Sequence, residues 1–292
     1  MILRFQNETL SLTSLPLFKC RLSIYNNRIR LLELGKKMTT LSKDNPPDLP
    51  YSPALGYTLL ASAYILGITS LMMWLAFVFH GGFNFINSSG IDETRILIFD
   101  TCLSLVFFIQ HSTMPRQWFQ KWLFKHVHKD LHGAIFTIAT AIPLLAVTIL
   151  WLKSGHVLIP INGVYRYLMH LVFFLGAAGF YWGVQSLGTF DIFGIGAIPK
   201  RLQGAQLPPD IPFTIRGPYR LVRHPLYLSV LLMIWSCPNL TSDRLLHNII
   251  WTIWIVVATI LEEGNLKHAF GDAYSKYQKQ VPMLIPWRIR NS

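Results

Sequence analysis

Six apolar runs of helix length constrain the fold of this chain more than any other feature. They cover residues 55–80, 94–111, 133–152, 164–186, 226–240 and 244–261. Crossing a bilayer takes about 20 apolar residues, and only helices and closed barrels satisfy their backbone hydrogen bonds there. The runs predict an all-α integral membrane protein with about six transmembrane helices. The fifth run is short, and residues 238–243 join it to the sixth through helix-stop and N-cap chemistry, so we expect a short C-terminal helical hairpin.

The distribution of charge supports a membrane protein and predicts its orientation. Only 14% of the residues are charged, against about 25% in soluble domains. A net charge of +12 would suggest nucleic acid in a soluble protein, but here 22 of the 26 Lys and Arg residues lie between or beyond the apolar runs, in residues 1–54, 113–132, 187–225 and 264–292. Such residues mark cytoplasmic segments. Both termini are therefore expected in the cytoplasm, at a bacterial inner membrane or an ER-type membrane, with no nucleic-acid partner.

Three regions follow from this pattern. Residues 1–50 are expected to form a basic, disordered tail, 51–186 a four-helix membrane region, and 187–292 a region that binds a polar ligand. The three cysteines lie far apart without CxxC spacing, so we expect neither a disulfide framework nor a metal site.

The most informative motif is GPYRLVRHPLY at residues 217–227. Pro225 favours a helix that begins at that residue, which places Arg223 and His224 at the positive end of the helix, where a carboxylate or phosphate would bind. The alternative is a basic cluster that faces lipid headgroups, with Tyr227 in the interfacial aromatic belt.

Two adjacent acids, Glu262 and Glu263, follow the last apolar run. Acids at the cytoplasmic end of a helix oppose the helix dipole and need partners, for which Arg223 or Arg220 is within reach. They form either a structural salt bridge or a site for a ligand amine or ribose hydroxyls. Tyr274 and Tyr277 share one helical face nearby, and aromatic faces suit a sulfonium, although anchoring in the interface is the simpler role.

Two glycine patterns have simpler explanations. Residues 190–197 read FDIFGIGA, which lacks the third glycine and the βαβ context of a dinucleotide-binding loop. Gly176, Gly179 and Gly183 have the small-residue spacing that allows helices to pack closely in membranes.

These motifs together resemble the isoprenylcysteine carboxyl methyltransferase superfamily, and within it the NnrU and methanethiol S-methyltransferase branch. The resemblance rests on residues 217–227, on Glu262-Glu263, on the segment 270–286, and on QHSTM at 110–114 and FDIFG at 190–194. It covers most of residues 94–287.

The resemblance implies an all-helical membrane enzyme that binds S-adenosyl-L-methionine at its cytosolic side and receives its acceptor from the lipid. Residues 211–214 would add backbone contacts, and Arg223 would orient the loop or stabilise charge. Arg223 and His224 are the implied catalytic residues. The implied cofactor-binding residues are Tyr219, His224, Pro225, Leu226, Tyr227, Glu262, Glu263 and Tyr274.

Methyl transfer requires alignment of a nucleophile and exclusion of water. For a thiol, the thiolate attacks; Arg223 or Arg220 could favour the anion, and His224 or His111 could accept the proton.

Three departures from the family pattern bear on the acceptor. Ser229 replaces a glycine, and Gly264-Asn265 replaces an Arg-Asp pair. Residues 257–261 lack the arginine that serves the substrate carboxylate in isoprenylcysteine enzymes. The predicted acceptor is therefore a small thiol or another lipid-soluble nucleophile. The alternatives are isoprenylcysteine carboxyl methylation, a non-catalytic nurim-like membrane protein, and a sterol-reductase-like oxidoreductase, against which the short chain counts.

Overall fold

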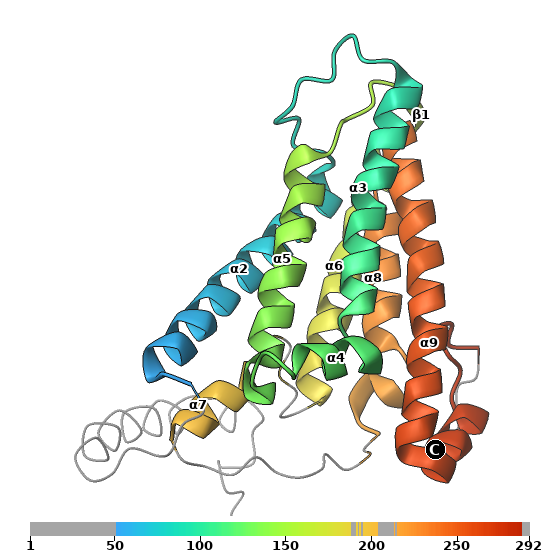
Figure 1. The fold of residues 1–292 in the computed structure, drawn as a ribbon. Helices are drawn as coiled ribbons and strands as arrows, with labels where there is room; N and C mark the ends of the chain where they lie inside the picture. The colour runs from blue at the N-terminus through green and yellow to red at the C-terminus, as the bar shows by residue number, and fades with distance from the viewer. Residues whose placement is uncertain are drawn as a thin grey trace, which may run out of the picture.

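The computed structural model describes residues 51–187, 191, 193, 195–203, 213 and 215–287. The predicted tail 1–50 lies outside these residues. Long helices run side by side and dominate the structure, while the short helices α4 (Gln117–Leu123) and α7 (Ala197–Leu202) lie across one end (Figure 1). We call this end, where α9 also bends, the site end.

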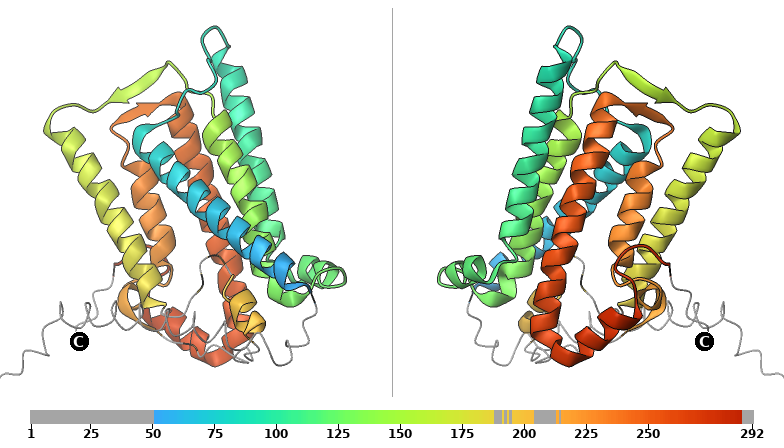
Figure 2. Two further views of the ribbon diagram at one scale, coloured as in Figure 1. Left: turned by 90° about the vertical axis from the view of Figure 1, so that its left-hand side faces the viewer. Right: turned by 90° about the vertical axis from the view of Figure 1, so that its right-hand side faces the viewer.

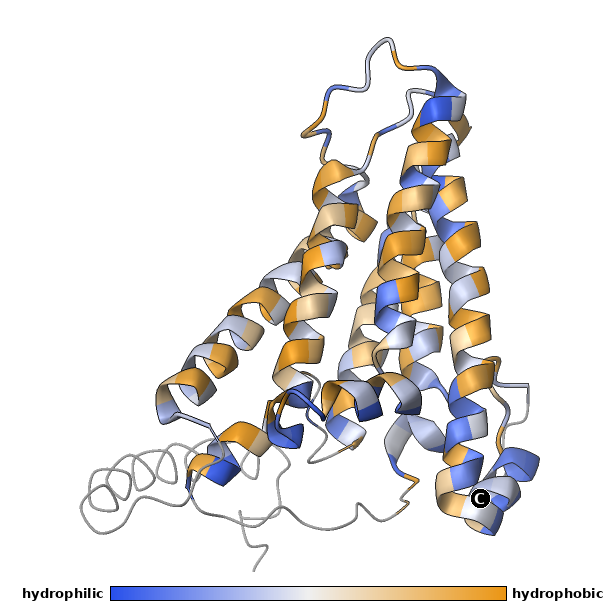
Figure 3. Cartoon of the chain, in the orientation of Figure 1, coloured by the Kyte–Doolittle hydropathy of each residue, from blue (hydrophilic) through white to orange (hydrophobic). Residues whose placement is uncertain are grey.

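Five helices in the described part of the chain are long and apolar enough to cross a membrane. They are α2 (Pro53–His80), α3 (Glu93–Thr113), α5 (His132–Leu150, preceded by the 3-10 turn η2, Lys129–Leu131), α6 (Val164–Ser186) and α9 (Ser242–Gln280). Apolar residues cover most of their length in Figure 3, and polar residues gather where α9 bends. The chain is thus an all-α, multi-pass membrane protein.

The fifth apolar run forms a short helix, as its length predicted, and the helix ends five residues before the run does. Helix α8 covers Pro225–Trp235, only 11 residues. At 1.5 Å per residue it is about 16 Å long, roughly half the hydrocarbon thickness. The helix ends at Trp235 because the chain becomes extended soon afterwards and enters strand β2 at Asn239. The six predicted apolar runs therefore correspond to five span-length helices and one short helix.

A small antiparallel sheet stands where the sequence predicts a turn. Strand β2 (Asn239–Thr241) pairs with β1 (Val157–Pro160), which precedes α6. Strand β1 leads into α6 and β2 leads into α9, so their pairing holds the starts of these two helices together at the end opposite the site end (Figure 2). Thr241 precedes α9 without a side-chain capping bond, so the predicted N-cap chemistry is not used.

The predicted close packing of the α6 glycines is confirmed. A Cβ at Gly176 would lie 2.9 Å from Met233 Cγ, one at Gly179 would lie 2.9 Å from Ser229 Oγ, and one at Gly183 would lie 2.6 Å from Leu226 Cδ2. All three neighbours belong to α8. Since lipid is as apolar as these side chains, close backbone approach rather than hydrophobic burial holds α8 against α6.

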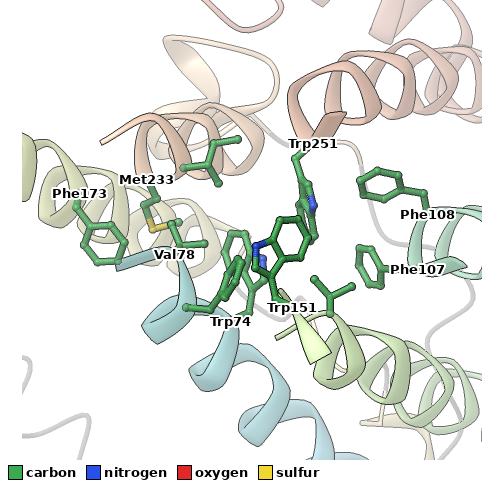
Figure 4. Packing of buried hydrophobic residues seen from close by; sticks show 11 residues of the cluster. Trp74, Val78, Phe107, Phe108, Trp151, Phe173, Met233 and Trp251 are labelled. Carbon is green, nitrogen blue, oxygen red and sulfur yellow. The ribbon is translucent and has the colours of Figure 1, made fainter. Parts of the chain in front are cut away.

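Aromatic side chains from several helices fill the bundle interior. Trp251 of α9 stacks on Trp74 of α2 at 5.4 Å and on Phe107 of α3 at 5.3 Å between ring centroids. Trp151, Phe108 and Met233 belong to the same cluster (Figure 4).

At the end opposite the site end, the buried Arg244 donates to the carbonyls of Phe77 and Val78, which are among the last carbonyls of α2. These contacts fix the position of α9 relative to α2.

Candidate functional site

The site lies where α8 begins, close to the acidic pair of α9. The approach to α8 is the 3-10 turn η3 (Gly217–Arg220), in which Gly217 has φ +52°. A Cβ at Gly217 would collide with Ser186 Oγ. Glycine therefore allows this turn to lie directly on the end of α6.

Helix α8 begins at the predicted residue. Pro225 occupies the first turn, and His224 precedes it without a side-chain capping bond. The backbone N–H groups of the first turn thus have no side-chain cap, and the helix presents its positive end to this region.

Arg223 joins three parts of the chain. Its Nε donates to Glu263 Oε1 at 2.6 Å, and one terminal nitrogen donates to the carbonyls of Gln278 at 3.0 Å and Val281 at 2.6 Å. Both charged side chains of the pair are largely buried, at 10% and 13% exposure. Two of the three guanidinium nitrogens are therefore occupied by protein groups.

The two acids differ in their surroundings. Glu263 accepts from Arg223 and from Gln278 Nε2, the latter at 2.9 Å, and lies 3.2 Å from His224 Nε2. Glu262 is 45% exposed, and its nearest ion-pair contact is His224 Nδ1 at 3.8 Å. Glu263 therefore holds the structure together, while the carboxylate of Glu262 remains accessible to a ligand.

Helix α9 continues well beyond the predicted end at residue 261 and bends sharply at Gly271, where φ is +54° and ψ is −126°. Beyond the bend the chain returns toward the start of α8 (Figure 2). The backbone N–H groups of Arg223 and His224 donate to Pro282 and Met283. Below, "returning segment" means residues 272–284.

The returning segment brings the two predicted tyrosines to the site. Tyr277 donates its hydroxyl to the carbonyl of Tyr219 at 2.6 Å. Tyr274 is only 1% exposed, and its hydroxyl has no hydrogen-bond partner among the described residues. A buried, unpartnered hydroxyl is costly, so it marks a place where a ligand atom or a water would bind.

The charges at the site favour a neutral histidine and a cationic ligand. Burial lowers the pKa of His224 below its usual value, although the carboxylates of Glu262 and Glu263 oppose the shift. Burial and the charge of Glu262 raise the pKa of the Tyr219 hydroxyl. With His224 neutral, the two negative charges of Glu262 and Glu263 exceed the single positive charge of Arg223.

The remaining predicted residues occupy different positions. The rings of Tyr227 and His224 stack at 5.6 Å, whereas the side chains of Pro225 and Leu226 face Gly183 of α6. Any ligand contact from these two would come from their backbone. Arg220 lies exposed in η3. Of the residues 211–214, only Phe213 is described, and its ring packs against Phe270 at 5.2 Å and Tyr277 at 5.6 Å.

The FDIFG segment has a structural role where it is described. Asp191 accepts backbone bonds from Phe193 and Gly196, and Thr137 of α5 donates to the carbonyl of Phe193 at 2.6 Å.

Sequence reasoning missed two residues that shape the site. Gln278 contacts both Arg223 and Glu263, but a glutamine in a polar helix carries no recognisable signal. Gly271 did carry a recognisable signal, because a glycine inside a helical pattern permits a bend.

The excess negative charge and the unpartnered Tyr274 hydroxyl suit a polar, positively charged organic ligand. Across the part of the chain that the structure describes, no three His, Cys, Asp or Glu side chains are grouped to hold a metal ion.

Comparisons with known proteins agree with this description. The chain is 31% identical to a methanethiol S-methyltransferase of Pseudomonas sp. (strain GM41(2012)), over 70% of this chain and 78% of that protein. It is 28% identical to methanethiol S-methyltransferase 1 of Bradyrhizobium diazoefficiens, over 78% and 80% respectively. Similarity to nurim of Rattus norvegicus is lower, 25% over 62% of this chain and 72% of that protein. No protein-family model and no solved structure matches the chain.

Proposed function

The chain belongs to the methanethiol S-methyltransferase family, and from this premise we propose that it is a membrane-bound, S-adenosyl-L-methionine-dependent thiol S-methyltransferase. The observation that carries the proposal is the unequal pair of acids. Glu263 is fixed by Arg223 and Gln278, whereas Glu262 is accessible beside a neutral His224.

The charges of the site fit this cofactor. S-adenosyl-L-methionine carries a sulfonium, an ammonium and a carboxylate, so its net charge is positive. Glu262 supplies the negative charge for the ammonium or accepts from ribose hydroxyls, and the uncapped start of α8 attracts the carboxylate. The faces of Tyr227 and Tyr274 suit the sulfonium.

The residues of the site hold and orient rather than react. Arg223 and Glu263 position His224 and the returning segment, and the hydroxyl of Tyr274 has the free hydrogen-bonding capacity that a ligand needs. When bound, the cofactor supplies a methyl group that is already electrophilic. What remains for the protein is to align the acceptor and exclude water.

The acceptor we propose is a small thiol. Carboxylate acceptors would need a cation near residues 257–261, but this stretch has none. Its Val257, Ile260 and Leu261 are exposed on the outer face of α9, where lipid would cover them. A small lipid-soluble thiol needs no such charge and can reach the site through the bilayer.

We also propose that the site end faces the cytosol, together with both termini. The basic residues that the structure describes within 113–132, 195–225 and 264–287 lie at this end, as expected for cytoplasmic segments.

Calorimetric titration of the detergent-purified protein with S-adenosyl-L-methionine, and in parallel with NADPH, tests the proposal. Binding of the methyl donor alone, followed by transfer of labelled methyl to methanethiol, is the expected result. Binding of neither by a folded protein would indicate a nurim-like scaffold, and binding of NADPH would indicate a reductase.

A further inference from the structure

The mechanism proposed above contains no free base for the thiol proton, because both nitrogens of His224 face carboxylates. Resting on the proposed function, we infer that the acceptor binds beside His111, between α3, α5 and α9, and that the imidazole of His111 takes its proton.

The surroundings of His111 are aromatic on several sides. Its ring lies 5.3 Å from Phe107 of its own helix, 5.2 Å from Phe136 of α5 and 5.5 Å from Trp254 of α9, measured between centroids. Phe107 in turn faces Trp251 in the bundle interior (Figure 4). We refer to His111, Phe107, Phe136 and Trp254 as the imidazole cage.

A polar atom in this cage lacks a partner. Nδ1 of His111 is buried and makes no hydrogen bond to any described residue, and it forms no ion pair with a described acid. By contrast, the neighbouring Trp254 donates its indole N–H to Ser112 Oγ at 3.0 Å. An unpaired ring nitrogen among apolar faces can accept one hydrogen bond from a small ligand.

The cage has the chemistry that suits a small thiol. Aromatic rings make favourable contacts with sulfur, and an S–H group is a weak donor that an imidazole nitrogen accepts. Among the described side chains, no Lys or Arg makes a cation–π contact with the rings of the cage, so a carboxylic acid or a phosphate would find no such cation there. The cage therefore favours a neutral, compact, apolar molecule with one weakly acidic proton.

The cage is close to the proposed cofactor site because α9 contributes to both. Trp254 and Glu262 are eight residues apart, a rise of about 12 Å along the helix. The sulfonium of S-adenosyl-L-methionine lies near the middle of that molecule, so a cofactor held at Glu262 can extend its methyl group toward the cage.

The step balances without another reactant. The thiol proton moves to the imidazole nitrogen, the sulfur electron pair forms a bond to the methyl carbon, and the methyl–sulfonium bond breaks. The products are a methyl thioether, a neutral thioether cofactor and an imidazolium, which releases its proton to solvent in the next phase of the cycle.

The test compares two thiols in His111→Gln. With an alkanethiol, which is protonated at neutral pH, we expect kcat to fall roughly 100-fold or more, because general bases contribute about 10²–10⁴. With an aryl thiol that is already ionised at the assay pH, the loss should shrink to less than about fivefold, since no base is then required. The affinity for S-adenosyl-L-methionine should stay within about twofold of wild type.

The control is His156→Gln, which removes an exposed histidine at the opposite end of the bundle and should leave both activities unchanged. Equal losses with both thiols, or no loss with either, would overturn the role of His111. If the wild-type protein neither binds the methyl donor nor methylates any thiol, the proposed function itself has failed.

Phe136→Ala provides a second test that leaves the imidazole in place. Opening the cage should raise the rate with a bulkier thiol relative to methanethiol, at unchanged affinity for the methyl donor. An unchanged ratio of the two rates would show that the acceptor binds elsewhere.

Discussion

At the scale of single residues, adjacent acids have different roles. Glu263 is buried against Arg223 and Gln278, and Glu262 is half exposed at the site. The resemblance implies a catalytic role for Arg223 and a cofactor-binding role for Glu262. The contacts of Arg223 are instead those of a residue that holds the returning segment and Glu263 in place.

Glu262→Gln should weaken S-adenosyl-L-methionine binding roughly tenfold or more at unchanged stability, because a hydrogen bond to a charged group contributes about 1.5–3 kcal/mol. Arg223→Ala should instead destabilise the protein by about 3 kcal/mol, since it leaves Glu263 buried without its partner. Calorimetry and thermal unfolding of both variants check this. If Arg223→Ala unfolds at the wild-type temperature, the contacts of Arg223 are not needed for stability.

Because His224 is neutral in the folded protein, we expect the protein to lose stability in acid. Its pKa is lowered in the folded protein, whereas an unfolded histidine titrates near 6.5. The stabilisation is therefore fully present above about pH 6.5, and it is lost as the pH falls from there toward the lower folded pKa, because the unfolded chain binds the proton first. Thermal unfolding between pH 7.5 and 5.5 should show a smaller decrease for His224→Gln than for wild type. Parallel curves would mean that His224 does not contribute.

At the scale of elements, the bend in α9 creates the site. A straight α9 would carry Tyr274 and Tyr277 away from α8, whereas the positive φ of Gly271 turns the chain so that Pro282 and Met283 pair with Arg223 and His224. The glycines of α6 contribute from the other side of α8, because they let α8 pack closely against α6 with its first turn beside the returning segment.

Gly271→Ala should impair the site through its backbone alone. No atom lies within 4 Å of a Cβ built there, so the cost is the strain of a positive φ, about 1–3 kcal/mol. We expect a lower unfolding temperature and weaker binding of S-adenosyl-L-methionine.

Gly264→Ala is the matched control, because its Cβ also meets open space but its backbone is helical. It should be neutral or stabilise the protein by up to about 1 kcal/mol. Equal effects of the two substitutions would show that the bend is not required.

At the scale of the whole molecule, the charged ends of the helices predict orientation. Arg244 lies at the end opposite the site end, but it is buried against α2 carbonyls and so carries no information about topology. The basic residues at the site end are then the charges that indicate orientation, and they favour a cytosolic site.

Single cysteines introduced into a variant without native cysteines test this orientation. Lys125→Cys, at the site end, should react with a membrane-impermeant maleimide only after the cells are opened. Ser89→Cys, in the loop that precedes α3, should react in intact cells. The reverse pattern would place the site on the outer face.

The sequence by itself determined the membrane class, four of the helices to within a few residues, the start of α8 at Pro225 and the packing role of the α6 glycines. These follow from local rules, namely the length of apolar runs, the fixed φ of proline and the absence of a Cβ. Tertiary structure decided which of two adjacent acids meets Arg223, because neighbouring positions on a helix point about 100° apart. The rotation of α9 about its own axis determines which acid faces Arg223, and packing of α9 against α2 and α3 sets that rotation. The β1–β2 pair and the contacts of Gln278 likewise depend on partners that lie far away in the chain.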